Sequence, residues 1–251
     1  MGAYRVLRVA DPLGAPPDPG QFAMIAAAQR WGGGADERPY LPRAFSVARW
    51  RDGEAHFLIE DVGPGSARLC ELRRGDDLWV LGPLGRGFAA PTDKRRALLV
   101  GGGAGIAPLA ILQDHLHAAA TPIAVLLGFR DAHHAHGAAL VSDASVATQD
   151  GSSGRRGLVT DLLVEALDHD SHAQVYACGP AGMLEAVRAI CEKRSIPAQL
   201  ALESGMACGF GACYGCAVPT RSGGYLRLCI DGPVLDAAIL ESVDIHAGAP
   251  A

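Results

Sequence analysis

Four cysteines crowd into a short stretch near the C-terminal end of the sequence. They follow the pattern C-x4-C-x2-C-x12-C, with ligand candidates Cys208, Cys213, Cys216 and Cys229. The first three match the spacing that binds a plant-type [2Fe–2S] cluster, in which a more distant fourth cysteine completes the site. Glycines at 209, 211 and 215 permit a tight loop that directs backbone N–H groups at the sulfurs. The spacing therefore predicts an iron–sulfur cluster held by four thiolates.

A structural zinc site with four cysteine ligands is the alternative interpretation. Zinc ribbons favour two separated C-x2-C pairs, whereas this stretch contains one, formed by Cys213 and Cys216. Cys70 and Cys191 stand apart from the group, and we expect them to be small buried side chains. An odd total of 7 cysteines, clustered in this way, favours metal or redox chemistry over a disulfide framework.

Three short motifs occur in order within the first part of the chain. RAFS occupies residues 43–46, VGPGS residues 62–66 and LGPLGRGF residues 81–88. Each motif alone would be explained by a strand edge or a hairpin turn. Their order is the informative feature.

Two glycine-rich segments favour nucleotide binding in the second part. GGGAGIAP, residues 101–108, follows the apolar run ALLVGG and precedes a helical pattern. Small residues let a pyrophosphate approach a helix N-terminus, and proline is tolerated in a first helical turn. ACGPAGM, residues 177–183, resembles a second nucleotide segment, and a packed glycine turn is the alternative for both.

Arg130 is expected near the adenosine ribose, whereas His133, His134 and His136 are expected in a solvated loop.

The elements that would position these motifs fall into three groups. Residues 1–92 contain short β-rich runs separated by turns, which predicts an all-β antiparallel barrel. In residues 93–202 apolar strands alternate with helical patterns, which predicts a doubly wound parallel α/β domain. Residues 203–251 are rich in Gly and Cys and too few to bury much core, so we expect a small module stapled by metal.

Bulk composition excludes several classes of function. The net charge of −5 disfavours a nucleic-acid partner. No apolar run reaches the ~18 residues of a membrane span, and no signal-peptide pattern opens the chain. We therefore expect a cytoplasmic protein that does not associate with a membrane.

The motifs in this order resemble the ferredoxin–NADP reductase superfamily, with an appended cluster segment. The resemblance implies an FAD domain, an NAD domain and a [2Fe–2S] module. It implies FAD contacts at Arg43, Ala44, Phe45, Ser46, Ile59, Glu60, Asp61, Gly65 and Ser66. It implies nicotinamide-nucleotide contacts at Gly101, Gly102, Gly103, Gly105, Pro108, Gly179 and Pro180, with Cys178 beside the nicotinamide.

The segments LESGMACGFGACYGCAV and LCIDGPVLDA narrow the resemblance further. The chain is similar to electron-transfer subunits of NAD-linked dihydroorotate dehydrogenases, although Ala44 stands where that family often has proline. The resemblance implies an oxidoreductase subunit that passes electrons from the FMN of a catalytic partner through [2Fe–2S] and FAD to NAD+. It also implies a heterotetramer with that partner, in pyrimidine biosynthesis. The alternatives are a flavin and iron–sulfur subunit of a bifurcating transhydrogenase or sulfhydrogenase, a stand-alone flavin reductase, and a non-catalytic zinc scaffold.

Overall fold

The N-terminal part of the chain forms an antiparallel sheet of five strands. This computed structural model describes residues 1–251 except 12–13, 33–38, 92 and 244–251. The sheet has the order β1-β4-β3-β2-β5, with strands β1 (Tyr4–Ala10), β2 (Phe22–Ala27), β3 (Arg43–Arg51), β4 (Glu54–Glu60) and β5 (Leu78–Leu84). Ile25, Phe57 and Ile59 pack inside it with Leu69 of the short helix α1 (Pro64–Cys70). All five strands coincide with β-rich runs expected in residues 1–92. The sequence also predicts a surface loop over residues 30–42, and its residues 33–38 lie outside the described part of the chain.

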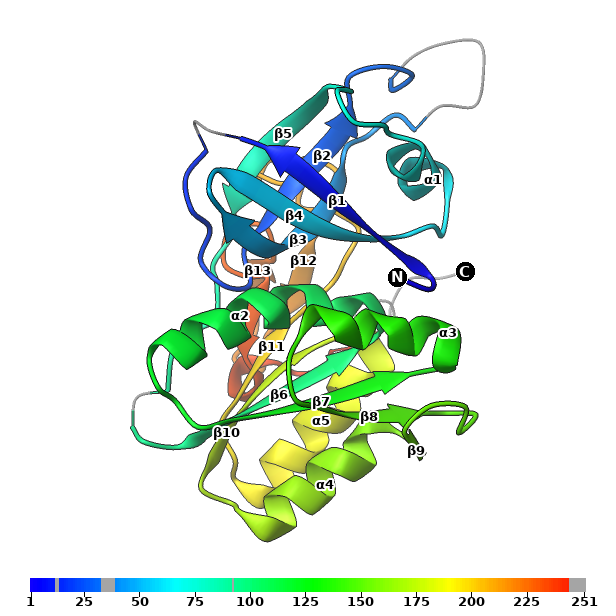
Figure 1. The fold of residues 1–251 in the computed structure, drawn as a ribbon. Coiled ribbons are helices and arrows are strands. Elements are labelled where there is room, and N and C mark those ends of the chain that lie inside the picture. Colours follow the sequence, from blue (N-terminus) through cyan, green and yellow to red (C-terminus); the bar gives the residue numbers. More distant parts are fainter. Residues whose placement is uncertain (12–13, 33–38, 92, 244–251) are drawn as a thin grey trace.

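The second part is a doubly wound sheet, as predicted (Figure 1). Its order is β14-β11-β10-β6-β7-β8-β9, parallel except at β14. The parallel strands are β6 (Arg96–Gly102), β7 (Ile123–Phe129), β8 (Ala144–Thr148), β9 (Arg155–Arg156), β10 (Ala173–Cys178) and β11 (Ala198–Ala201). Helices α2 (Ile106–Ala118) and α3 (Ala132–Ala135) cover one face, and α4 (Val159–His169) and α5 (Ala181–Arg194) cover the other. No described helix is long and apolar enough to cross a membrane.

The C-terminal part is attached to the second sheet by more than its cysteine loop. A hairpin of β12 (Ala217–Pro219) and β13 (Tyr225–Arg227) leads to β14 (Val234–Asp236), which pairs antiparallel with β11. Val218 and Leu228 share a buried core with Leu200 of β11. Strand pairing and apolar packing therefore hold this segment, in addition to the metal staple expected from the sequence.

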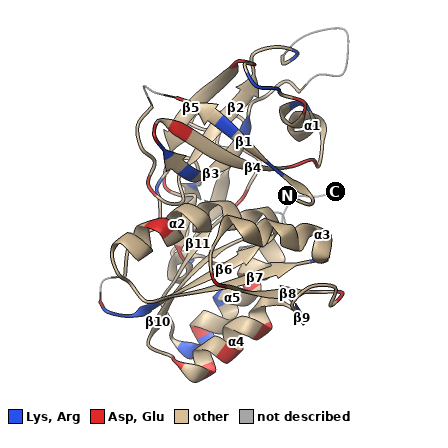
Figure 2. Cartoon of the chain, viewed as in Figure 1, with Lys and Arg blue, Asp and Glu red and all other residues tan. Residues whose placement is uncertain are grey.

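An ion pair joins the two larger parts of the molecule. Arg49 of β3 bonds to the Asp114 carboxylate of α2 and donates to the Leu140 carbonyl at 2.5 Å. Figure 2 shows this basic strand facing the acidic residue on α2. The Arg49 side chain is 18% exposed. Water therefore solvates its charge poorly, and the two acceptors stabilise that charge instead.

We predict that Asp114→Asn lowers the melting temperature by about 2–8 °C, because it removes the charged acceptor of a largely buried guanidinium. Differential scanning calorimetry measures the change. Glu165→Gln is the matched control, because Glu165 pairs with Arg155 where both side chains are about half exposed. Exposed pairs of this kind contribute at most about 1 kcal/mol. Equal melting temperatures for the two variants would contradict the inter-domain role of Arg49.

Candidate functional site

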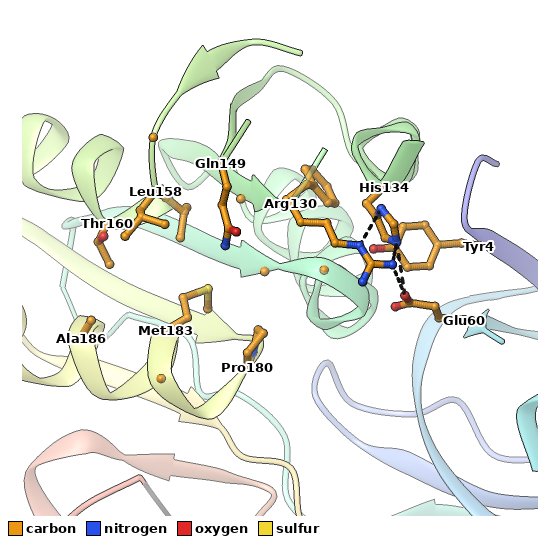
Figure 3. A pocket seen from close by; sticks show the side chains of 17 residues that line it. Tyr4, Glu60, Arg130, His134, Gln149, Leu158, Thr160, Pro180, Met183 and Ala186 are labelled. Atoms are coloured by element: carbon orange, nitrogen blue, oxygen red, sulfur yellow. Dashed lines mark hydrogen bonds and ion pairs between the residues drawn. The ribbon is translucent and has the colours of Figure 1, made fainter. Parts of the chain in front are cut away.

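A cavity of about 400 Å³ opens at the carboxyl ends of β6, β7, β8 and β10. Gly102 and Gly103 line it after β6, Arg130 after β7, Gln149 after β8 and Pro180 after β10 (Figure 3). Ligands of open α/β sheets bind at this edge, where neighbouring strands connect in opposite directions. Here that position lies between β6 and β10. The cavity is therefore the candidate nucleotide site.

The two glycine-rich segments pack against each other beside this cavity. A Cβ atom on Gly105 would lie 2.4 Å from the carbonyl oxygen of Cys178 and 2.6 Å from the Cα of Gly179. A side chain at Gly105 would thus collide with backbone that cannot move aside. Pro108 lies in the first turn of α2, as expected. Gly101 instead faces Leu127 in the core, so it shapes the strand end rather than the cavity wall.

The Cys178 thiol lies in the core. It is 2% exposed, and burial raises its pKa well above the ordinary range. Among the described residues, Cys178 lines neither this cavity nor its neighbours. Contact with a nicotinamide stays a prediction, and the visible role of Cys178 is to position the Gly179 turn.

A second cavity, of about 350 Å³, lies between the antiparallel sheet and α2. Ala44, Phe45 and Ser46 of β3 form one wall. Ala104, Ala107 and Pro108, at the start of α2, form another. Residues 202, 203, 204, 206 and 233 close the third side. Since the last three residues of the RAFS motif line this cavity, it is the candidate flavin site.

Of the other flavin candidates, Glu60 lines this cavity and the rest do not. Arg43 lies over Gly65, since a Cβ there would be 2.6 Å from the Arg43 Nε. The Ser66 hydroxyl accepts the N–H groups of residues 62 and 63 at 2.9 and 3.0 Å, so it shapes the turn at the start of α1. Glu60 lines both cavities. Ile59 instead lies in the sheet core and Asp61 is exposed outside the cavity.

The four candidate cluster ligands gather as two pairs. The sulfurs of Cys216 and Cys229 are 3.3 Å apart in a buried position. Cys208 and Cys213 interact through their thiol groups, and the charge of Cys208 also acts on Cys229. A [2Fe–2S] cluster has two irons that together take four cysteines. Two pairs of thiols match the two irons of this group. Within the described part of the chain, no three His, Cys, Asp or Glu side chains lie close enough together to hold a metal ion as they stand.

Backbone N–H groups surround the first of these sulfurs. The N–H of Cys213, helped by those of Phe210 and Ala212, lowers the pKa of Cys208 to about 6. Burial, followed by the hydrogen bond with Cys216, raises the pKa of Cys229 to about 11. Amide groups that stabilise a thiolate stabilise a metal-bound sulfur in the same way. The donor set and its surroundings therefore fit an iron–sulfur cluster.

The loop that carries the cysteines rests on the flavin-domain sheet. Gly209 and Gly211 have φ values of +80° and +84°, which favour glycine. A Cβ on Gly209 would lie 2.5 Å from Met24 of β2. Arg227 closes the loop by donating to the Gly211 carbonyl at 2.9 Å. The cluster loop thus touches the same sheet that lines the flavin cavity.

Several site residues were missed in the sequence. Glu203 and Ser204 follow β11, and that strand was not predicted, although an apolar run before a polar residue could have revealed it. Glu203 is exposed to the cavity, yet the surrounding chain removes enough water to raise its pKa. The expected solvated loop was wrong at His134, which is buried in α3 and pairs with Asp131 at 2.6 Å.

Comparisons with known proteins agree with this geometry. Residues 203–241 match the "Iron-sulfur cluster binding domain of dihydroorotate dehydrogenase B" and residues 99–189 match the "Oxidoreductase NAD-binding domain". A solved structure of an NADH-dependent reduced ferredoxin-NADP oxidoreductase, 24% identical, has a TM-score of 0.80 over 97% of this chain and 87% of that one. That similarity shows the fold. It confirms the predicted combination of antiparallel and doubly wound domains.

Relatives of higher identity show the family. The electron transfer subunit of dihydroorotate dehydrogenase B (NAD(+)) from Caldanaerobacter subterraneus is 38% identical over 88% of this chain and 86% of its own length. The corresponding subunit from Geobacillus kaustophilus is 38% identical over 87% and 85%. The probable subunit from Methanopyrus kandleri is 37% identical over 90% and 82%. This chain therefore belongs to the family of dihydroorotate dehydrogenase B electron transfer subunits.

Proposed function

We propose that this chain transfers electrons from the FMN of a separate dihydroorotate-oxidising subunit to NAD+, by way of its own [2Fe–2S] cluster and FAD. The reaction belongs to pyrimidine biosynthesis. FAD, when bound, exchanges electron pairs with a nicotinamide and single electrons with an iron–sulfur cluster. Family membership supports the proposal, and so does the arrangement of the three candidate sites.

One observation carries the proposal: the candidate flavin cavity has walls from all three parts of the chain. β3 supplies the RAFS motif, α2 supplies the wall shared with the nucleotide loop, and residues 202–206 form the side next to Cys208. The nucleotide cavity meets the flavin cavity at Glu60. A flavin held there would adjoin both a nicotinamide site and the cluster loop.

The cysteine loop has one sheltered and one open side. Cys216 and Cys229 are buried, whereas Cys213 is exposed. Phe210 and Tyr214, which flank Cys213, are 58% and 63% exposed. The open side is where we place the FMN-containing subunit, in a heterotetramer with two copies of each chain. Reduced cysteine ligands also suit a cytoplasmic location.

We predict one FAD and one [2Fe–2S] cluster per chain after anaerobic purification, and loss of the cluster in Cys208→Ser and Cys216→Ser. Thiolates are the expected iron ligands, and serine is a poor replacement for them. Iron and sulfide analysis with electron paramagnetic resonance measures the change. Cys70→Ser is the matched control, because Cys70 lies in α1, outside the candidate ligand set. Zinc without acid-labile sulfide in the wild-type chain would sink the assignment.

We also predict that the chain co-elutes with the FMN-containing subunit from the same genome and confers dihydroorotate-dependent NAD+ reduction. Neither subunit alone should show this activity, because the sites for dihydroorotate and NAD+ lie on different chains. Size-exclusion chromatography and an NADH absorbance assay measure both properties. Separate elution with no gain of activity would favour a subunit of the bifurcating-transhydrogenase kind.

A further inference from the structure

Tyr4 is a residue of the antiparallel sheet that enters the core of the nucleotide domain. It is the first residue of β1 and pairs in register with Glu60 of β4. Its ring packs against the nucleotide domain, since a Cβ on Gly137 would lie 2.9 Å from a ring carbon. The Ala3 N–H donates to the His133 carbonyl at 3.3 Å and fixes the strand there. The ring is 1% exposed.

Within the described part of the chain, the Tyr4 hydroxyl has no hydrogen-bond partner although it is shut off from water. An unsatisfied buried hydroxyl costs about 1–3 kcal/mol, so its presence calls for an explanation. Tyr176 is a useful contrast, because this equally buried hydroxyl donates to the Ala89 carbonyl at 3.0 Å. Burial, followed by the charge of Glu60, raises the pKa of Tyr4. The group therefore stays protonated and able to donate.

The hydroxyl points to the glycine loop at the end of the nucleotide cavity. A Cβ on Gly103 would lie 3.8 Å from the Tyr4 hydroxyl oxygen. Gly103 begins the 3-10 turn Gly103–Gly105 that leads into the N-terminus of α2, where anions bind favourably. Tyr4 and Gly103 both line the cavity. A phosphate bound at this loop would therefore come close to the hydroxyl.

Charged groups surround Tyr4 at this end of the cavity. Figure 3 shows Tyr4 behind His134 and Arg130, with Glu60 beside them. Glu60 lies 3.4 Å from the His134 ring nitrogen and 3.7 Å from Arg130, and Asp131 lies 3.6 Å from Arg130. The Arg130 side chain is 64% exposed, against 9% for His134. Arg130 also contacts the His134 ring, but it is the most exposed member of this group and its positive charge attracts a phosphate.

We propose that Tyr4 is a nucleotide-binding residue supplied by the flavin domain, whose hydroxyl donates a hydrogen bond to the diphosphate of NAD(H) in this cavity. The inference rests on the proposed function and names a residue that the glycine motifs do not include. It also explains why a strand of one domain inserts a tyrosine into the other.

Isothermal titration of the FAD- and cluster-loaded chain with NAD+ and with ADP-ribose tests the proposal. Tyr4→Phe should raise both dissociation constants about 10-fold, the loss expected for one hydrogen bond to a charged oxygen. Its melting temperature without nucleotide should not fall, because the variant removes an unpaired buried hydroxyl. Tyr176→Phe, the matched control, should melt lower and bind both ligands like the wild type.

A second measurement needs no loss of the hydroxyl. With 3-fluorotyrosine at position 4, the fluorine resonance should shift when ADP-ribose is added. Dissociation constants of Tyr4→Phe within about twofold of wild type, or an unmoved resonance, would overturn the role of Tyr4. A wild-type chain that binds no NAD+ would overturn the proposed function together with this inference.

Discussion

The packing of the antiparallel sheet against helix α2 is the contact on which both cavities depend. The flavin cavity has β3 on one side and the start of α2 on the other. The nucleotide cavity takes Tyr4 and Glu60 from the same sheet. Each cavity is lined by residues of both domains, so neither domain alone would form it. The Arg49–Asp114 ion pair and the buried Tyr4 ring therefore hold together the site as well as the fold.

The C-terminal segment fastens the cluster loop to both domains. Gly209 packs on Met24 of the flavin-domain sheet, while β14 pairs with β11 of the nucleotide-domain sheet. This double attachment places the cysteines beside the chain that closes the flavin cavity. It also limits relative movement of the domains, which suits a protein whose task is to keep three redox groups at fixed positions.

Local patterns were sufficient to predict much of this molecule. The cysteine spacing, the glycine segments and the short β-rich runs are read from neighbouring residues. The strict alternation of side chains in β4 could also have separated Glu60 from its inward-facing neighbour Ile59. The pairing of β14 with β11, and the approach of Tyr4 to Gly103, join residues far apart in the sequence. Periodicity carries no information about such contacts, so they were missed.

The central claim is that a bound flavin connects the nucleotide cavity to the cysteine loop within this one chain. Anaerobic addition of NADH to the loaded chain, followed by electron paramagnetic resonance, tests it most directly. We expect the signal of the reduced cluster to develop in the loaded chain and to be absent when FAD has been removed and the cluster retained. A cluster that NADH reduces equally fast without FAD, or fails to reduce when FAD is bound, would contradict the account.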